Sequence, residues 1–116
     1  MSVSLGSLPP LLRNDDAVTS LAGATDAVLA VPEPARAFVV AGLAHLSKRH
    51  PILVATPTAA DAERLAHDAR AFLGYDAVDL FPAWETLPFE RVSPSVDTMG
   101  RRLRAMWRLR DPGRMP

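Results

Sequence analysis

Hydrophobic positions along this chain alternate between short apolar runs and longer stretches with helical spacing. The runs lie at residues 27–31 (AVLAV), 52–55 (ILVA) and 77–81 (AVDLF), and each is bounded by an acidic residue, a threonine or a proline. Short apolar runs of about four to eight residues are typical of strands buried in a parallel sheet. The pattern therefore predicts a short buried strand at each of these three places.

Apolar residues in the stretches between these runs recur every three or four positions, as on one face of a helix. The clearest stretch follows Thr58, where Asp61 three residues later is typical of a helix start and Gly74 of a helix stop. We expect helices from Asn14 or Asp15 to Leu21, from Pro34 to Ser47, from Thr58 to Leu73, and from Ser95 or Asp97 to Leu109.

Strands that alternate with helices through short connections are typical of a parallel sheet with right-handed crossovers. We therefore expect a three-layer α/β fold. Within its 116 residues we assign an N-terminal arm at 1–13, whose glycine and prolines interrupt any periodicity, and one α/β module at 14–116. The chain stops soon after its last helix without a closing strand, so we expect a truncated module with an incomplete sheet.

Composition narrows the possible chemistry. The chain has 13 Lys+Arg against 13 Asp+Glu, so no overall charge attracts it to nucleic acid or to anionic lipid. Cysteine is absent, which excludes disulfides, zinc–thiolate sites and thiol catalysis. No apolar run approaches the roughly 20 residues of a membrane-spanning helix, and the N-terminus does not resemble a signal peptide. These features predict a cytoplasmic protein.

The turn after the first predicted strand is where an α/β fold of this kind holds phosphate. On the pattern G-x-x-x-x-G-K-[ST], the four diagnostic positions fall on Ala30, Ala35, Arg36 and Ala37. Pro32 and Pro34 each lack an N–H donor, and Glu33 adds a carboxylate that would repel phosphate. We predict a fold related to phosphate-loop NTPases whose loop has degenerated and binds no cofactor. A nucleotide-binding domain with an unorthodox anion site around Arg36 remains the alternative from the enzyme class.

The segment LFPAWETLPFERVSPS at residues 80–95 is too rich in proline for a helix or a central strand. We predict an ordered loop that Trp84 and Phe89 hold against the domain. The helix after it carries an apolar stripe at Met99, Leu103, Met106 and Trp107. Such a stripe normally faces a core, so we expect Trp107 to be buried.

The same helix carries arginines at 101, 102, 104, 108 and 110, on faces other than the apolar stripe. We interpret Arg101 and Arg104 as surface or partner contacts, and a nucleic-acid-binding module that uses this helix remains a second alternative. Glu85 and Glu90 have no histidine near them that could complete an acid–base pair, so we expect structural roles for them, such as capping or pairing with Arg91. The histidines at 45, 50 and 67 lack the spacing of metal ligands, so we predict neither a catalytic nor a metal site.

Taken in order, ILVATPTAADAERL, FPAWETLPFERVSPS and RRLRAMWRL resemble an early segment of bacterial transcription-repair coupling factors. The resemblance covers about residues 17–110, and its most specific part is FPAWETLPFERVSPS. It implies an N-terminal scaffold module similar to the ATP-dependent subunit of the excision nuclease, with the ATP motif lost and no catalysis of its own.

The same resemblance implies a parent protein that is an ATP-driven DNA translocase, which displaces stalled RNA polymerase and recruits nucleotide excision repair. ATP and Mg²⁺ would then bind in motor domains outside this chain. The implied partners are the following domains of the same polypeptide, the damage-recognition subunit of the excision repair machinery, and RNA polymerase and DNA through other domains.

Overall fold

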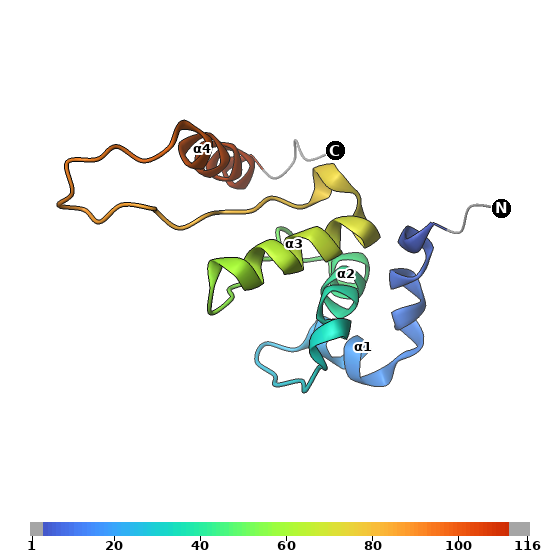
Figure 1. Ribbon diagram of the computed structural model, residues 1–116. Helices are drawn as coiled ribbons and strands as arrows, with labels where there is room; N and C mark the ends of the chain where they lie inside the picture. The colour runs from blue at the N-terminus through green and yellow to red at the C-terminus, as the bar shows by residue number, and fades with distance from the viewer. Residues whose placement is uncertain (1–3, 112–116) are drawn as a thin grey trace.

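The computed structural model describes residues 4–111, and every regular element in this range is helical (Figure 1). The α-helices are α1 (Asp16–Gly23), α2 (Arg36–Leu46), α3 (Ala59–Leu73) and α4 (Val96–Arg110). Short 3-10 helices are η1 (Leu5–Ser7), η2 (Pro9–Asn14), η3 (Glu33–Ala35) and η4 (Tyr75–Ala77). The prediction of a three-layer α/β fold with a parallel sheet is therefore wrong, because the described residues form an all-α structure.

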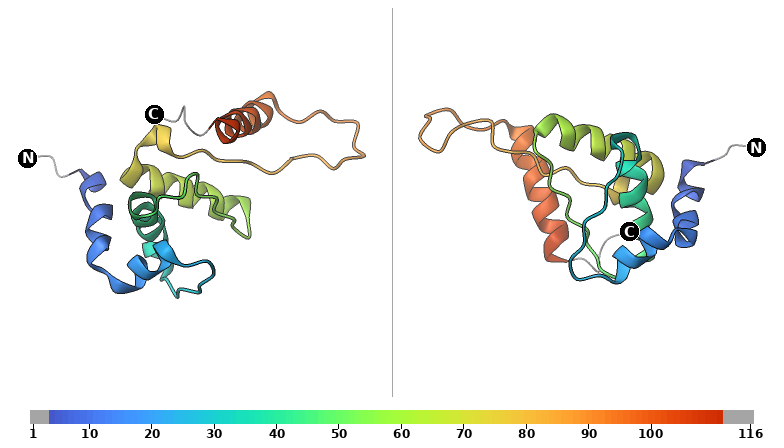
Figure 2. Two further views of the ribbon diagram at one scale, coloured as in Figure 1. Left: turned by 180° about the vertical axis from the view of Figure 1, so that it is seen from behind. Right: turned by 90° about the horizontal axis from the view of Figure 1, so that it is seen from below.

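Apart from Ala77, which ends η4, the three predicted strands run as coil, and none is paired within residues 4–111 (Figure 2). Their side chains are not buried either, since Val28 is 99% exposed and Leu53 is 78% exposed. A strand is stable only when a neighbouring strand accepts and donates its backbone hydrogen bonds. A short apolar run indicates where such a segment could lie, but it does not provide the neighbour. The predicted kinship with phosphate-loop NTPases, which rested on that sheet, fails with it.

The helix predicted between Thr58 and Gly74 is confirmed with both of its ends. Thr58 Oγ1 accepts a hydrogen bond from the Asp61 backbone N–H at 3.1 Å and donates one to the Asp61 carboxylate at 2.7 Å. Gly74 ends α3 with φ of +92°, a conformation in which a side chain is strained. The N-caps of α1 and α4 follow the same rule, through Asp15 to Val18 N–H and through Ser95 to Thr98 N–H.

The core lies where α2 crosses α3, and it consists of small residues. Ala37 and Ala41 of α2 are 3% and 0% exposed, and Ala66 and Ala69 of α3 are also buried. Alanines on both surfaces let the helices approach closely, so little apolar volume is needed to fill the space between them. At the edge of this contact the rings of Phe38 and Phe72 lie 5.5 Å apart.

The described part of the predicted N-terminal arm packs on the helices. Pro9 in η2 is among the most completely buried residues, and η2 lies against α1 and α2. A Cβ added to Gly42 of α2 would lie 2.4 Å from Leu12 Cδ1, so glycine is what allows η2 to come so close. The N-terminal segment therefore completes the helical body made of η1, η2, α1, α2 and α3.

The remaining element, α4, lies outside this body at the end of a long excursion of the chain (Figure 1). The radius of gyration is 16.0 Å, whereas about 13 Å is typical of a compact domain of 100 residues. The accessible surface is 8869 Å², against about 6,200 Å² for a compact protein of this mass. The molecule thus exposes about 2,700 Å² more than a compact fold would. No helix within residues 4–111 is long and apolar enough to cross a membrane.

Candidate functional site

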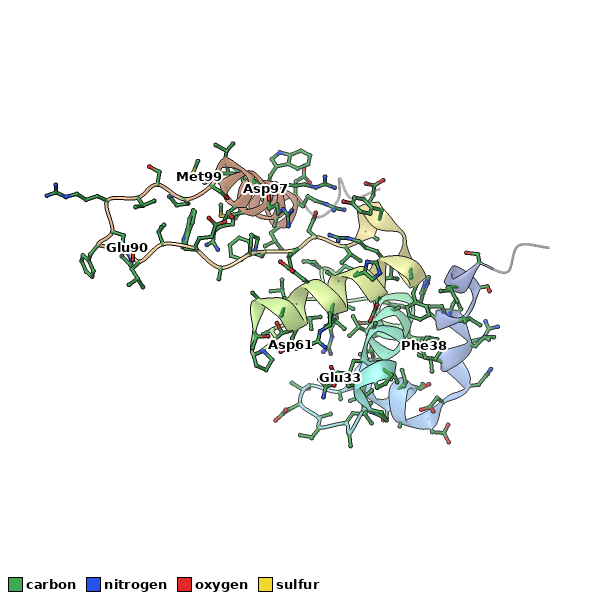
Figure 3. All side chains as sticks on the ribbon, in the orientation of Figure 1. Glu33, Phe38, Asp61, Glu90, Asp97 and Met99 are labelled. Atoms are coloured by element: carbon green, nitrogen blue, oxygen red, sulfur yellow. The ribbon has the colours of Figure 1, made fainter. Side chains whose placement is uncertain are left out.

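The candidate site comprises α4 and the segment that leads into it, residues 78–95, of which we call residues 82–95 the proline loop (Figure 3). The orientation of α4 is the reverse of the predicted one. Leu103 and Trp107 are 63% and 57% exposed, while Arg108 is only 8% exposed. The prediction that Trp107 is buried is therefore wrong.

Asp79 explains why arginines rather than apolar residues face the rest of the chain. Its Oδ2 lies 2.5 Å from Arg108 Nη1, and its Oδ1 lies 3.1 Å from Arg104 Nε. The Asp79 and Arg108 side chains are 22% and 9% exposed, so this ion pair is largely shielded from water. A shielded carboxylate needs a cation beside it, and α4 supplies two of them on one face.

Two aromatic residues hold a third arginine of α4. The Arg102 guanidinium lies 4.0 Å from the ring centre of Phe81 and 4.3 Å from that of Trp84. Its Nη1 also donates a hydrogen bond to the Pro82 carbonyl at 2.5 Å. Cation–π contacts of this kind stabilise a partly exposed site by about 0.5–2 kcal/mol. Trp84 thus contacts α4 through Arg102 while remaining half exposed, and its role in holding the loop against the domain stays a prediction.

Glu85 joins the start of the proline loop to the start of α4. It accepts hydrogen bonds from Ser95 Oγ at 2.9 Å, from the Ser95 backbone N–H at 3.4 Å, and from Thr98 Oγ1. The hydrogen bond from Thr98, followed by those from Ser95, lowers the pKa of Glu85 from its ordinary value. The contact closes the neck of the loop, because it links positions ten residues apart. The sequence predicted a structural role for Glu85, such as capping or pairing with Arg91, but not these partners, Ser95 and Thr98.

The far end of the proline loop is a turn over residues 87–90. The Glu90 N–H donates to the Leu87 carbonyl at 3.0 Å, and the Leu87 N–H donates to the Glu90 carboxylate at 3.2 Å. Phe89 is 97% exposed at this turn. The prediction that Phe89 holds the loop against the domain is therefore wrong.

The remaining predicted interaction residues, Arg101 and Arg104, lie about half exposed on α4 in ion pairs. Arg101 Nε lies 2.9 Å from Asp97 one turn earlier, and Arg104 also approaches Asp76 at 3.8 Å. A cavity of about 280 Å³ lies beside them, lined also by Arg70, Tyr75 and Leu80. The carboxylates at its wall already neutralise these two arginines, so the cavity is a poor site for an anion.

Three of the degenerate phosphate-loop positions, Ala35, Arg36 and Ala37, lie at the start of α2, and Ala30 lies in the coil before it; no strand precedes them in the described chain. The N–H groups of Ala35 and Arg36 donate to the carbonyls of Pro32 and Glu33 within η3. Ala37 is buried, while Ala30 and Arg36 are exposed. The Glu33 carboxylate lies 3.6 Å from Arg64 Nη1. Backbone donors that a phosphate would use are therefore already engaged locally.

The amino-acid sequence matches two curated proteins, and both are much longer than this chain. It is 49% identical over 84 residues to the transcription-repair-coupling factors of Mycobacterium bovis and Mycobacterium tuberculosis. The matched region makes up 72% of this chain and 6% of each relative. No family model matches the chain, and no solved structure matches it significantly. The resemblance carried by the motifs is confirmed: over those 84 residues, this chain is homologous to a subregion of the transcription-repair-coupling factors.

Proposed function

We propose that this chain is the N-terminal scaffold module of a transcription-repair coupling factor. The observation that carries the proposal is the 49% identity over 84 residues with the two mycobacterial factors. The parent would be an ATP-dependent DNA translocase in the cytoplasm that displaces stalled RNA polymerase and recruits nucleotide excision repair. Its motor domains would bind ATP and Mg²⁺. The module itself would contact the following domains, and the damage-recognition subunit, RNA polymerase and DNA would bind mainly elsewhere on the parent.

A scaffold role without catalysis is supported by the start of α2. Pro32 and Pro34 have no N–H, and the N–H groups of Ala35 and Arg36 are engaged within η3. A phosphate needs several backbone donors directed at it. Within residues 4–111, histidine, aspartate and glutamate side chains form no group of three that could hold a metal ion. These features disfavour a nucleotide-binding enzyme built on Arg36.

The arrangement of α4 disfavours direct binding of DNA through this helix. Arg108 is buried on Asp79, and Arg102 is stacked on two aromatic rings. Arg101 and Arg104 are paired with carboxylates at 2.9 Å and 3.1 Å. Contact with phosphate depends on cations that are free to replace its counterions. Arg102, Arg104 and Arg108 instead join α4 to the segment that precedes it, which suits a scaffold.

An exchange of segments tests the proposal. The matched segment of the M. tuberculosis factor is replaced by that of this chain, and repair of the transcribed strand is measured. We expect coupling of repair to transcription to be retained. As the matched control, an unrelated helical segment of the same length should abolish coupling. A chimera with unchanged ATPase activity and melting temperature that fails to couple repair would contradict the proposal.

A second experiment tests the absence of nucleotide binding. The purified chain is titrated with a fluorescent ATP analogue, and the same titration is run on Arg36→Ala. We expect no saturable binding by either protein in the micromolar range. Saturable binding that is lost in Arg36→Ala would instead favour the nucleotide-binding alternative.

A further inference from the structure

Residues 78–110, which we call the α4 unit, are held together by contacts among themselves. Asp79 at the start of the unit pairs with Arg108 near its end at 2.5 Å. Arg102 of α4 lies over two aromatic rings of the preceding segment, at 4.0 Å and 4.3 Å from their centres. Glu85 closes the neck of the proline loop by accepting hydrogen bonds from the start of α4. The helix is thus joined to the segment before it at three places, which makes the unit one mechanical piece.

Contacts between the α4 unit and the helical body are few. In Figure 1, α4 lies apart from α1, α2 and α3, and it makes no extensive contact with any other helix that the structure describes. One hydrogen bond joins the described residues of the two parts, from Arg70 Nη2 to the Val78 carbonyl at 3.4 Å. A hydrogen bond of this length is weak. Two parts of a chain are expected to move relative to each other unless a large apolar interface joins them.

The surfaces that face each other beside this hydrogen bond are not packed. The cavity of about 280 Å³ lies here, between Arg70 and Tyr75 on one side and Asp97, Arg101 and Arg104 of α4 on the other. Packed protein interiors contain few voids larger than a water molecule. A space of this size with charged walls lets the two surfaces shift without breaking apolar contacts.

The chain passes from the body to the α4 unit through residues 74–77. Gly74 has φ of +92°, and a Cβ built on it would meet nothing within 4 Å, so no neighbouring group holds this position. The next three residues form η4, a single 3-10 turn whose hydrogen bond from the Ala77 N–H to the Gly74 carbonyl is long, at 3.4 Å. Hinges consist of a few such residues at the ends of elements, which absorb changes in φ and ψ.

We propose that residues 74–77 are a hinge about which the α4 unit turns as one piece relative to the helical body. The hydrogen bond from Arg70 to Val78 restricts the rotation, because it spans the hinge. The rotation changes the direction of α4 and of the proline loop together and leaves the pairing of Asp79 intact. The proposal is independent of the activity of the parent protein.

Distances between pairs of spin labels, measured by double electron–electron resonance on the full chain, test the proposal. The chain has no cysteine, so labels attach only at introduced cysteines. The pair Glu63→Cys on α3 and Leu103→Cys on α4 spans the hinge. As references, Ala17→Cys with Glu63→Cys lies within the body, and Ala83→Cys with Leu103→Cys lies within the α4 unit; all four residues are exposed. We expect the distance distribution across the hinge to be at least about twofold wider than that of either reference pair.

Two substitutions separate the hinge from the contacts inside the unit. Arg70→Ala should widen the distribution across the hinge and leave both references unchanged, whereas Asp79→Asn should widen the distribution within the α4 unit. His67→Ala, at an exposed residue one turn earlier on α3, is the matched control and should change none of the three. The proposal is overturned if the distribution across the hinge is as narrow as the references, or if that within the α4 unit is equally wide. Equal distributions across the hinge in Arg70→Ala and His67→Ala would overturn it as well.

Discussion

Replacing Asp79 by asparagine should detach α4 from the extended segment that leads into it. The substitution keeps the shape of the side chain and removes only its charge. It leaves the Arg108 guanidinium, whose side chain is 9% exposed, without the carboxylate that now lies 2.5 Å away. It also removes the 3.1 Å partner of Arg104, a side chain that is 53% exposed. The two arginines are therefore affected very differently by one change.

The expected loss of stability follows from these exposures. Removing one partner of a fully buried ion pair costs about 3–5 kcal/mol, because a buried charge is left uncompensated. Asp79 is 22% exposed, so water compensates part of that charge and the Arg108 contribution falls toward the lower end. The exposed contact with Arg104 adds at most about 1 kcal/mol. We expect a loss of about 2–4 kcal/mol in the free energy that holds α4 in place.

Hydrogen exchange of the α4 backbone amides reports this free energy, because a detached helix of this length is marginal in water and its amides exchange once it opens. Asp76→Asn is the matched control, because Asp76 is 79% exposed and lies 3.8 Å from Arg104. The control should change protection by less than about 0.5 kcal/mol. The double variant Asp79→Leu with Arg108→Leu should recover much of the loss, because no unpaired charge remains. Equal protection in Asp79→Asn and Asp76→Asn would refute the reasoning.

Three further substitutions test other contacts. Gly42→Ala should lower the local unfolding free energy of its helix, measured by hydrogen exchange, by about 1–3 kcal/mol more than Gly100→Ala lowers that of its own helix. The reason is that only the methyl group added at residue 42 meets a neighbouring side chain. Equal effects would contradict the packing. The lowered pKa of Glu85 means that its contribution to stability is complete above its ordinary value of 4.5 and is lost as the pH falls through the lower pKa of the folded state. Protection of α4 should therefore decline in acid, and less so in Glu85→Gln; the same decline in both proteins would count against this role. Trp84→Ala should lower the free energy of thermal unfolding by about 1–2 kcal/mol, because the contact of the ring with Arg102 is lost. Phe89→Ala should change it by less than about 0.5 kcal/mol, because that ring is exposed. Equal melting temperatures for the two variants would show that the Trp84 ring does not stabilise the protein.

Helices could be predicted from the sequence because their signals are local. The cap at Thr58, the carboxylate at Asp61 and the stop at Gly74 lie in the helix they define or directly beside it, and the structure reproduces all three. Strands could not be predicted in the same way. The runs at 27–31 and 52–55 are apolar enough for strands, but a strand also requires a partner from a distant part of the chain. Apolar composition carries no information about that partner.

The candidate site was found by its motif, but its contacts were only partly predicted. The segment at 80–95 does form a loop in which Trp84 contacts Arg102 of α4, and the homology over 84 residues to a subregion of the coupling factors is confirmed. The neck formed by Glu85 was missed, because its hydrogen bonds to Ser95 and Thr98 join residues whose individual signals indicated only a helix cap. The exposure of Phe89 depends on the direction in which a whole loop projects, which no local pattern specifies.

The reversed orientation of α4 shows how a helix can place its apolar face outward. Turning α4 by half a revolution about its axis would bring Leu103, Met106 and Trp107 toward the segment beneath the helix. Complete burial of large apolar side chains stabilises a fold by about 1.5–3 kcal/mol each. The surface beneath α4 is a single extended segment rather than a layer of helices, so it could cover only a fraction of that area. The same rotation would leave the shielded Asp79 carboxylate without its arginine partners, at a cost of several kcal/mol. It would also separate Arg102 from the two aromatic rings. The charge on Asp79, 29 positions before Arg108, thus decides which face of the helix is exposed, and helical periodicity alone cannot detect it.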